Sequence, residues 1–139
     1  MTHAIRIHAH GGPEVMQWED VPTPEPGPGE AVVKHEAVGL NYIDVYFRTG
    51  LYKAPLPATI GMEGAGTITA LGAGVTDLKV GDRVAYAGGP IGAYATARSI
   101  AADRLVRLPD TIDFSTGAAM MLQGMTAQYL LRRTFRVQA

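Results

Sequence analysis

Apolar and polar residues alternate along several short stretches of the chain, as they do in half-buried β-strands. Near the N-terminus, for example, Ile5 and Ile7 are flanked by polar residues. Segments rich in glycine or proline, such as Pro22–Glu30, separate these stretches and predict turns and loops. The predicted strands are Ala4–Ala9, Glu30–Val38, Glu63–Leu71, Arg83–Ala87, Ala93–Ala97 and Arg104–Arg107. Many short strands joined by glycine turns predict a mainly β domain with the form of a small barrel.

Two segments change to a helical period. Asn41 is a suitable N-cap, apolar and aromatic residues follow it at helical spacing, and Gly50 ends this first helix. Further along, Asp113 is a capping residue for a second helical segment over 113–135, in which Gly124 is a point for a kink or a break. The methionines of this segment are predicted to pack in the core; they are Met120, Met121 and Met125.

Composition narrows the classes of function. The chain has 139 residues, 47% of them hydrophobic, and a net charge of −1, which suits one globular domain and offers no basic face for nucleic acid. It has no cysteine, which excludes disulfides and cysteine-ligated zinc. We see no signal peptide and no apolar run long enough to span a membrane, so a cytoplasmic location is expected. One dense basic run is either a solvated helix end, which we favour, or a phosphate site; it contains Arg132, Arg133 and Arg136.

The segment Gly61–Val75 (GMEGAGTITALGAGV) has the most specific pattern in the chain. Its first glycines are similar to a phosphate-binding G-x-G-x-x-G loop, but that motif needs a helix after it. The alternation over Thr67–Leu71 indicates a strand instead. We therefore favour glycine bends in a barrel wall over phosphate binding.

The spacing within this segment also resembles the signature of zinc-containing medium-chain alcohol dehydrogenases, G-H-E-x-x-G-x-x-x-x-x-G-x-x-V. The matching positions are Gly61, Glu63, Gly66, Gly72 and Val75. KVGDRV, at 79–84, is similar to the next landmark of that family. The resemblance extends over the whole chain, which looks like the GroES-like N-terminal part of a medium-chain dehydrogenase/reductase. It implies a partly open β-barrel followed by a helical segment.

The three positions that align with the family's zinc ligands hold Asn41, Met62 and Leu122. Zinc is bound by imidazole, thiolate or carboxylate groups, so this set of side chains predicts a zinc-free protein. The histidines do not replace the missing ligands in this interpretation. They are predicted to be solvated strand residues and are His3, His8, His10 and His35.

The zinc-free group that the chain most resembles is the NADPH:quinone oxidoreductases, which include ζ-crystallin-like proteins, through segments 37–52, 85–95 and 122–134. This resemblance implies NADP(H) as cofactor, a quinone or another electrophilic small molecule as substrate, and a homodimeric full-length enzyme. It also implies a catalytic site made of Asn41, Tyr46 and Tyr52. The implied contacts to the cofactor are Asn41, Gln123 and Thr126.

These residue types suit the reduction of a quinone. A quinone is already an electron sink, so hydride delivery to it needs no Lewis acid. The hydroxyls of Tyr46 and Tyr52 and the amide of Asn41 can donate hydrogen bonds to the quinone oxygens as charge develops there. The alternative is that both tyrosines are amphipathic surface or core residues. Asp44 is either a general acid or, as we favour, a carboxylate that orients its neighbours.

No segment of the chain predicts a dinucleotide-binding fold, in which a glycine turn at a helix N-terminus holds the pyrophosphate. In the family that fold begins shortly after the second helical segment. Residues 1–139 are therefore expected to be an incomplete, truncated GroES-like catalytic domain that is inactive alone. Two alternatives stay open, namely a zinc-free enoyl or alkenal reductase of the same superfamily and a non-catalytic GroES-like binding module.

Overall fold

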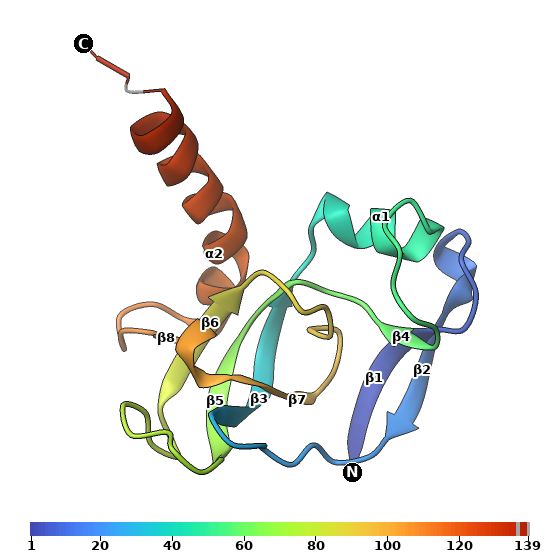
Figure 1. The fold of residues 1–139 in the computed structure, drawn as a ribbon, viewed down its shortest axis with the longest axis horizontal. Coiled ribbons are helices and arrows are strands. Elements are labelled where there is room, and N and C mark those ends of the chain that lie inside the picture. Colours follow the sequence, from blue (N-terminus) through green and yellow to red (C-terminus); the bar gives the residue numbers. More distant parts are fainter. Residues whose placement is uncertain (136, 139) are drawn as a thin grey trace.

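The computed structural model of the chain describes residues 1–135 and 137–138. Two antiparallel sheets and two α-helices make up this part of the chain (Figure 1). The smaller sheet has the strand order β2-β1-β4, and its strands are β1 (Thr2–Ile7), β2 (Met16–Val21) and β4 (Ala58–Thr59). The larger sheet has the order β7-β3-β5-β6-β8, and its strands are β3 (Glu30–Gly39), β5 (Glu63–Leu71), β6 (Arg83–Ala87), β7 (Ala97–Ala101) and β8 (Val106–Arg107). The helices are α1 (Tyr42–Thr49) and α2 (Phe114–Tyr129), with short 3-10 turns at Pro13–Val15 and Ala102–Arg104 and a π-helical turn at Leu130–Thr134.

The two sheets are connected through the backbone of β1. Ala4 forms an isolated antiparallel bridge with Ala95. Beside this bridge, the Ile5 N–H group donates to the Tyr94 carbonyl over 2.7 Å. The predicted mainly β architecture is confirmed, and the two sheets are not closed into a barrel.

Alternate residues of the larger sheet form its core. Val33, Ile68 and Val84 are buried together on neighbouring strands, as the alternation of apolar positions predicts. β3 and β5 approach each other closely at Gly66, where an added Cβ would lie 2.0 Å from the Lys34 carbonyl oxygen. This glycine is thus needed for the close approach of two strands, and not for a phosphate-binding loop, although the wall to which it belongs is an open sheet.

The strand predictions are right for β5 and β6, which lie inside the larger sheet and pair with a strand on each side. The bounds predicted for β5 and β6 are those observed. The strand predicted over Ala93–Ala97 is wrong, because the amides of Ala93 and Tyr94 donate to carbonyls of the segment before β5 rather than to a ladder partner. Strand β7 begins only at Ala97, and the strand predicted over Arg104–Arg107 is shortened to β8.

Helix α1 has the predicted ends. Asn41 is its N-cap, and its backbone N–H donates to the Asp44 carboxylate over 3.0 Å. Gly50 is the C-cap with a φ of 83°, a left-handed conformation that glycine adopts without a steric cost. α1 leads directly from the end of β3, so the fold fixes its first turn at one end of the larger sheet (Figure 1).

Helix α2 contacts β3, β5 and β6, and its residues are exposed from Gln123 onward. Asp113 is the N-cap and accepts a hydrogen bond of 2.8 Å from the Thr116 N–H, as predicted. The buried residues of α2 are Gly117 and Ala118. Beyond them the helix extends away from both sheets (Figure 1), and it passes Gly124 without a break. Within the described residues, no helix has the length and apolar character needed to cross a membrane.

The methionines of α2 differ in environment because the helix leaves the sheet. Met121 packs against the cluster that contains Leu108 and Ala118, as predicted. Met120 and Met125 are 37% and 49% exposed, so the prediction of core packing is wrong for these two.

The prediction of four solvated strand histidines is also partly wrong. His8 and His10 follow β1 rather than lie on it. His35 lies on β3 but points inward, where its ring nitrogens are 2.6 Å from the Ala95 carbonyl oxygen and 2.7 Å from the Tyr86 hydroxyl. His35 is two residues after Val33 on the same strand, and it shares the face of β3 that carries Val33 because side chains alternate along a strand.

Candidate functional site

A buried carboxylate connects the two helices at the end of the larger sheet. Glu63, the first residue of β5, is only 1% exposed. One of its oxygens, Oε2, accepts a hydrogen bond of 2.7 Å from the Asn41 side-chain amide. The other, Oε1, accepts a hydrogen bond of 2.8 Å from the Leu122 backbone N–H of α2. Glu63 therefore joins the first residue before α1 to the middle of α2.

The local sequence leaves room for this arrangement. Glu63 is paired with Gly39, the last residue of β3. A Cβ at Gly39 would lie 2.5 Å from Glu63 Oε2 and 2.5 Å from the Ala118 carbonyl oxygen. Glycine at this position thus allows both the carboxylate and α2 to approach β3 closely.

Asp44 lies one turn into α1 and is 3% exposed. Its Oδ2 atom accepts hydrogen bonds from the Asn41 N–H and, over 2.9 Å, from the Tyr94 hydroxyl. Its Oδ1 atom has no hydrogen-bond partner among the described residues. Burial raises the pKa of Asp44 above its ordinary value, and the hydrogen bonds from Asn41 and Tyr94 oppose this effect.

The predicted tyrosines form an aromatic cluster on α1 and the segment after it. The rings of Tyr46 and Tyr52 are 5.3 Å apart between centroids, and Tyr42 stacks edge-on against Tyr46 at the same distance. The Tyr52 N–H donates to the Tyr46 carbonyl over 3.1 Å, which fixes their relative placement. Tyr46 is half-buried and Tyr52 is 45% exposed, so each keeps an accessible surface.

The two predicted residues of α2 lie next to the residue that Glu63 holds. Gln123 follows Leu122 directly, and the Thr126 hydroxyl donates to the Leu122 carbonyl over 2.8 Å. Both side chains are exposed. The structure thus brings Asn41, through Glu63, to the turn of α2 that carries them, whereas Tyr46 and Tyr52 form a separate group.

A cavity of about 500 Å³ lies beside α1. Met62, at the position of the family's zinc-binding histidine, is part of its wall together with Phe47 and Ile91. Met62 and Phe47 were not identified as site residues from the sequence, and neither was Glu63. A charged residue at the start of a strand of small and apolar residues was the available signal for Glu63.

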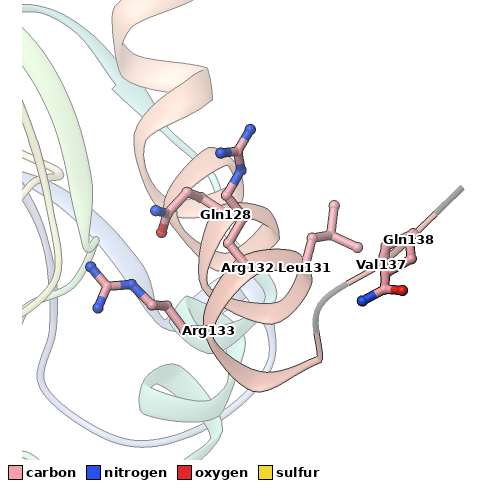
Figure 2. A pocket seen from close by; sticks show the side chains of 6 residues that line it. All are labelled: Gln128, Leu131, Arg132, Arg133, Val137 and Gln138. Atoms are coloured by element: carbon pink, nitrogen blue, oxygen red, sulfur yellow. The ribbon is translucent and has the colours of Figure 1, made fainter.

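A second cavity, of about 680 Å³, lies at the far end of α2 and is lined by Gln128, Leu131, Arg132, Arg133, Val137 and Gln138. The side chains of Arg132 and Arg133 point in different directions from the helix (Figure 2). They do not converge on one point, as the guanidinium groups of a phosphate site do. Arg136, the third member of the predicted basic run, lies outside the described residues.

The residues at the zinc-ligand positions are thus engaged in other ways. Asn41 and Leu122 are both hydrogen-bonded to Glu63, and Met62 faces the cavity beside α1. Within 1–135 and 137–138, no three or more His, Asp or Glu side chains are grouped as a metal ion would need.

The class of protein is defined by a GroES-like fold in which Asn41, Met62 and Leu122 occupy the zinc-ligand positions. Residues 27–132 match the alcohol dehydrogenase GroES-like domain, and the chain belongs to this family. Among curated proteins, it is 53% identical to a quinone oxidoreductase from Pseudomonas aeruginosa and 43% identical to quinone oxidoreductase 1 from Escherichia coli. Each alignment covers 99% of this chain, and the chain spans only 43% and 42% of those relatives.

Solved structures give the same result. The Escherichia coli quinone oxidoreductase complexed with NADPH superimposes with a TM-score of 0.96 at 43% identity, over 99% of this chain and 42% of that chain. The quinone oxidoreductase from Pseudomonas syringae has a TM-score of 0.96 at 49% identity, over 99% of this chain and 43% of that chain. A 2-haloacrylate reductase from a Burkholderia species is a further relative, 40% identical over 99% of this chain and 43% of its own length. The predicted resemblance to quinone oxidoreductases is confirmed.

Proposed function

We propose that residues 1–139 form the GroES-like catalytic part of an NADPH-dependent quinone reductase that works without zinc. The observation that carries this proposal is the similarity over nearly the whole chain to quinone oxidoreductases, one of them solved with NADPH at a TM-score of 0.96. The side chains of Asn41, Met62 and Leu122 support the zinc-free assignment, because none of them is a good zinc ligand.

In this proposal NADPH supplies a hydride, and the quinone takes up that hydride and one proton to become a hydroquinone. The chain's own contribution to holding the nicotinamide is the exposed turn of α2. The Gln123 amide offers both a donor and an acceptor for a carboxamide group. The Thr126 oxygen, whose hydrogen is used toward Leu122, keeps lone pairs that can accept a hydrogen bond. These groups fit an amide-bearing ligand.

The proposed quinone-binding residues are Tyr46, Tyr52 and Asn41. The two phenol hydroxyls can donate to quinone oxygens, which become more basic as the ring is reduced. Asn41 uses one amide hydrogen on Glu63 and keeps the second. Asp44 acts as an orienting carboxylate rather than as a general acid in this proposal, since it is 3% exposed and already accepts from Asn41 and Tyr94.

We also propose that 113–135 leads toward a dinucleotide-binding domain. Apolar side chains of α2 and its final turn are exposed, among them Met125, Tyr129, Leu130 and Leu131. Contiguous exposed apolar surface of this kind usually packs against another unit. The homodimeric state implied for the full-length enzyme is tested by its mass in solution.

A second candidate function is the reduction of an activated carbon–carbon double bond. The 40% identity to a 2-haloacrylate reductase favours it specifically. Such a substrate is also electron-poor, so hydride addition to it again needs no metal ion. The proton then goes to carbon instead of to an oxygen.

The test is the loss of NADPH absorbance with a 1,4-quinone or with 2-haloacrylate as acceptor. Purified 1–139 and the longest native reading frame that contains it are assayed in parallel. We expect quinone reduction only by a protein that also carries a dinucleotide-binding fold. Faster turnover of 2-haloacrylate would favour the second candidate, and turnover by 1–139 alone would overturn the assignment of cofactor binding to another domain.

A further inference from the structure

Glu63 is a buried carboxylate without a cationic partner. No Lys, Arg or His of the described residues forms an ion pair with it. Its two oxygens are instead used by two neutral donors, the Asn41 amide at 2.7 Å and the Leu122 N–H at 2.8 Å. A buried charge is costly unless hydrogen bonds stabilise it, so the burial of the Glu63 carboxylate depends on both donors.

The carboxylate also determines the direction of the hydrogen bond with the Asn41 side chain. A carboxylate only accepts, so the Asn41 side chain must turn its NH₂ group, and not its oxygen, toward Glu63. The bond to Leu122, four residues after the last buried position, Ala118, fixes α2 at the turn that also carries Gln123. The residues of α2 are exposed from Gln123 onward, so this bond lies at the point where α2 leaves the sheets.

We propose that Glu63 is a positioning residue, whose carboxylate sets the orientation of the Asn41 amide and the placement of α2 relative to α1. Its consequence for turnover rests on the proposed function, because those helices carry the residues assigned to quinone and nicotinamide. The consequence of Glu63 for the structure is independent of the proposed function. The two can therefore be tested separately.

The structural test replaces the carboxylate of Glu63 by an amide and then places a carboxylate at position 41 instead. In Glu63→Gln, the new amide can accept from only one of the two donors and turns its own NH₂ group toward the other. We expect exchange of the Leu122 amide hydrogen to become about tenfold faster or more, while exchange of the Ile68 amide in the core of β5 changes little. In Asn41→Asp/Glu63→Gln, the carboxylate and the amide change places, so both hydrogen bonds form again and Leu122 exchange returns to within about threefold of the wild type.

Each outcome of these hydrogen-exchange measurements decides the proposal. Equal acceleration of exchange at Leu122 and Ile68 would show a general loss of stability and would overturn the proposal. A double variant in which the Leu122 amide exchanges as fast as it does in Glu63→Gln would also overturn it. Glu36→Gln is the matched control, since this glutamate is exposed on β3. Hydrogen exchange in this control is expected to match the wild type at both amides.

The kinetic test uses the protein that shows quinone reduction. Glu63→Gln is expected to lower kcat about tenfold, because it releases both the Asn41 amide proposed at the quinone and the turn of α2 proposed at the nicotinamide. An unchanged kcat would overturn the catalytic consequence. If the wild type reduces no quinone, the proposed function fails, and the hydrogen-exchange comparison alone decides the positioning role.

Discussion

His35 connects three segments of the chain through a half-buried imidazole whose protonation state follows from its neighbours. A carbonyl only accepts, so the Nδ1 atom, 2.6 Å from the Ala95 carbonyl oxygen, must carry the hydrogen of the neutral ring. Nε2 is then an acceptor, and the Tyr86 hydroxyl at 2.7 Å is its donor. Burial is the main cause that lowers the pKa of His35 to about 4; the hydrogen bond to Ala95 opposes this change, and the Arg98 charge contributes to it.

This pKa makes the stability of the fold depend on pH. The unfolded histidine, with a pKa near 6.5, binds protons more readily than the folded one with a pKa of about 4. Stability contributed by the neutral ring is therefore fully present above pH 6.5 and is lost as the pH falls from 6.5 toward 4. At about pH 5 the unfolded ring is mostly protonated and the folded ring mostly neutral, which amounts to a loss of about 2 kcal/mol.

Urea unfolding of the wild type and His35→Gln at about pH 7 and about pH 5 tests this value. The free energy of unfolding of the wild type should fall by about 2 kcal/mol more than that of the variant, since all other titrating groups are shared. His10→Gln, at an exposed histidine, is the control and should keep the wild-type pH dependence. Equal losses in the wild type and His35→Gln would refute the reasoning, as would an NMR titration midpoint of His35 near 6.5.

Three further substitutions concern the proposed quinone site, the packing of the larger sheet and the exposed part of α2. Tyr46→Phe should lower kcat/KM for a quinone by about tenfold or more, because one hydroxyl donor is lost. Tyr42→Phe on the same helix is the control and should leave kcat/KM unchanged. Equal kcat/KM values for the two variants would show that Tyr46 does not belong to the site. Gly66→Ala should lower the free energy of unfolding by about 2 kcal/mol or more, because its Cβ would lie 2.0 Å from a backbone oxygen. Gly124→Ala, in α2 with no atom near its added Cβ, should raise it by up to about 1 kcal/mol, and urea unfolding compares the two.

Regular elements of the fold could be predicted because their local sequence and their long-range contacts agree. The alternation of β5 matches its pairing with β3 and β6 on both sides, and α1 has capping residues at both ends. β2 was missed because its exposed residues show no alternation, and it is formed only by pairing with β1. β4, two residues long after a proline-rich loop, is likewise determined by its partner.

The buried polar residues were less predictable. Glu63 was identified only as part of a signature, since its donors lie 22 and 59 residues away in the sequence. His35 was interpreted as solvated because histidine is polar, although it shares the inward face of β3 with Val33; its partners at Ala95 and Tyr86 lie 60 and 51 residues away. Both depend on contacts between distant segments, which the spacing of residue types in one segment does not contain.

The contacts of Glu63 also give physical content to the resemblance with zinc-containing dehydrogenases. The sequence comparison places the three zinc-ligand positions at Asn41, Met62 and Leu122, and Glu63 adjoins the second and is hydrogen-bonded to the first and third. A metal ion would hold three such segments together by coordination, whereas here one carboxylate holds two of them to β5 by accepting hydrogen bonds. This connection requires a donor at position 41 and a free backbone N–H at 122, and it leaves the side chain of Met62 to line the cavity beside α1. The electron-poor substrate that we propose suits such a site, because the protein then needs only to position the reacting groups.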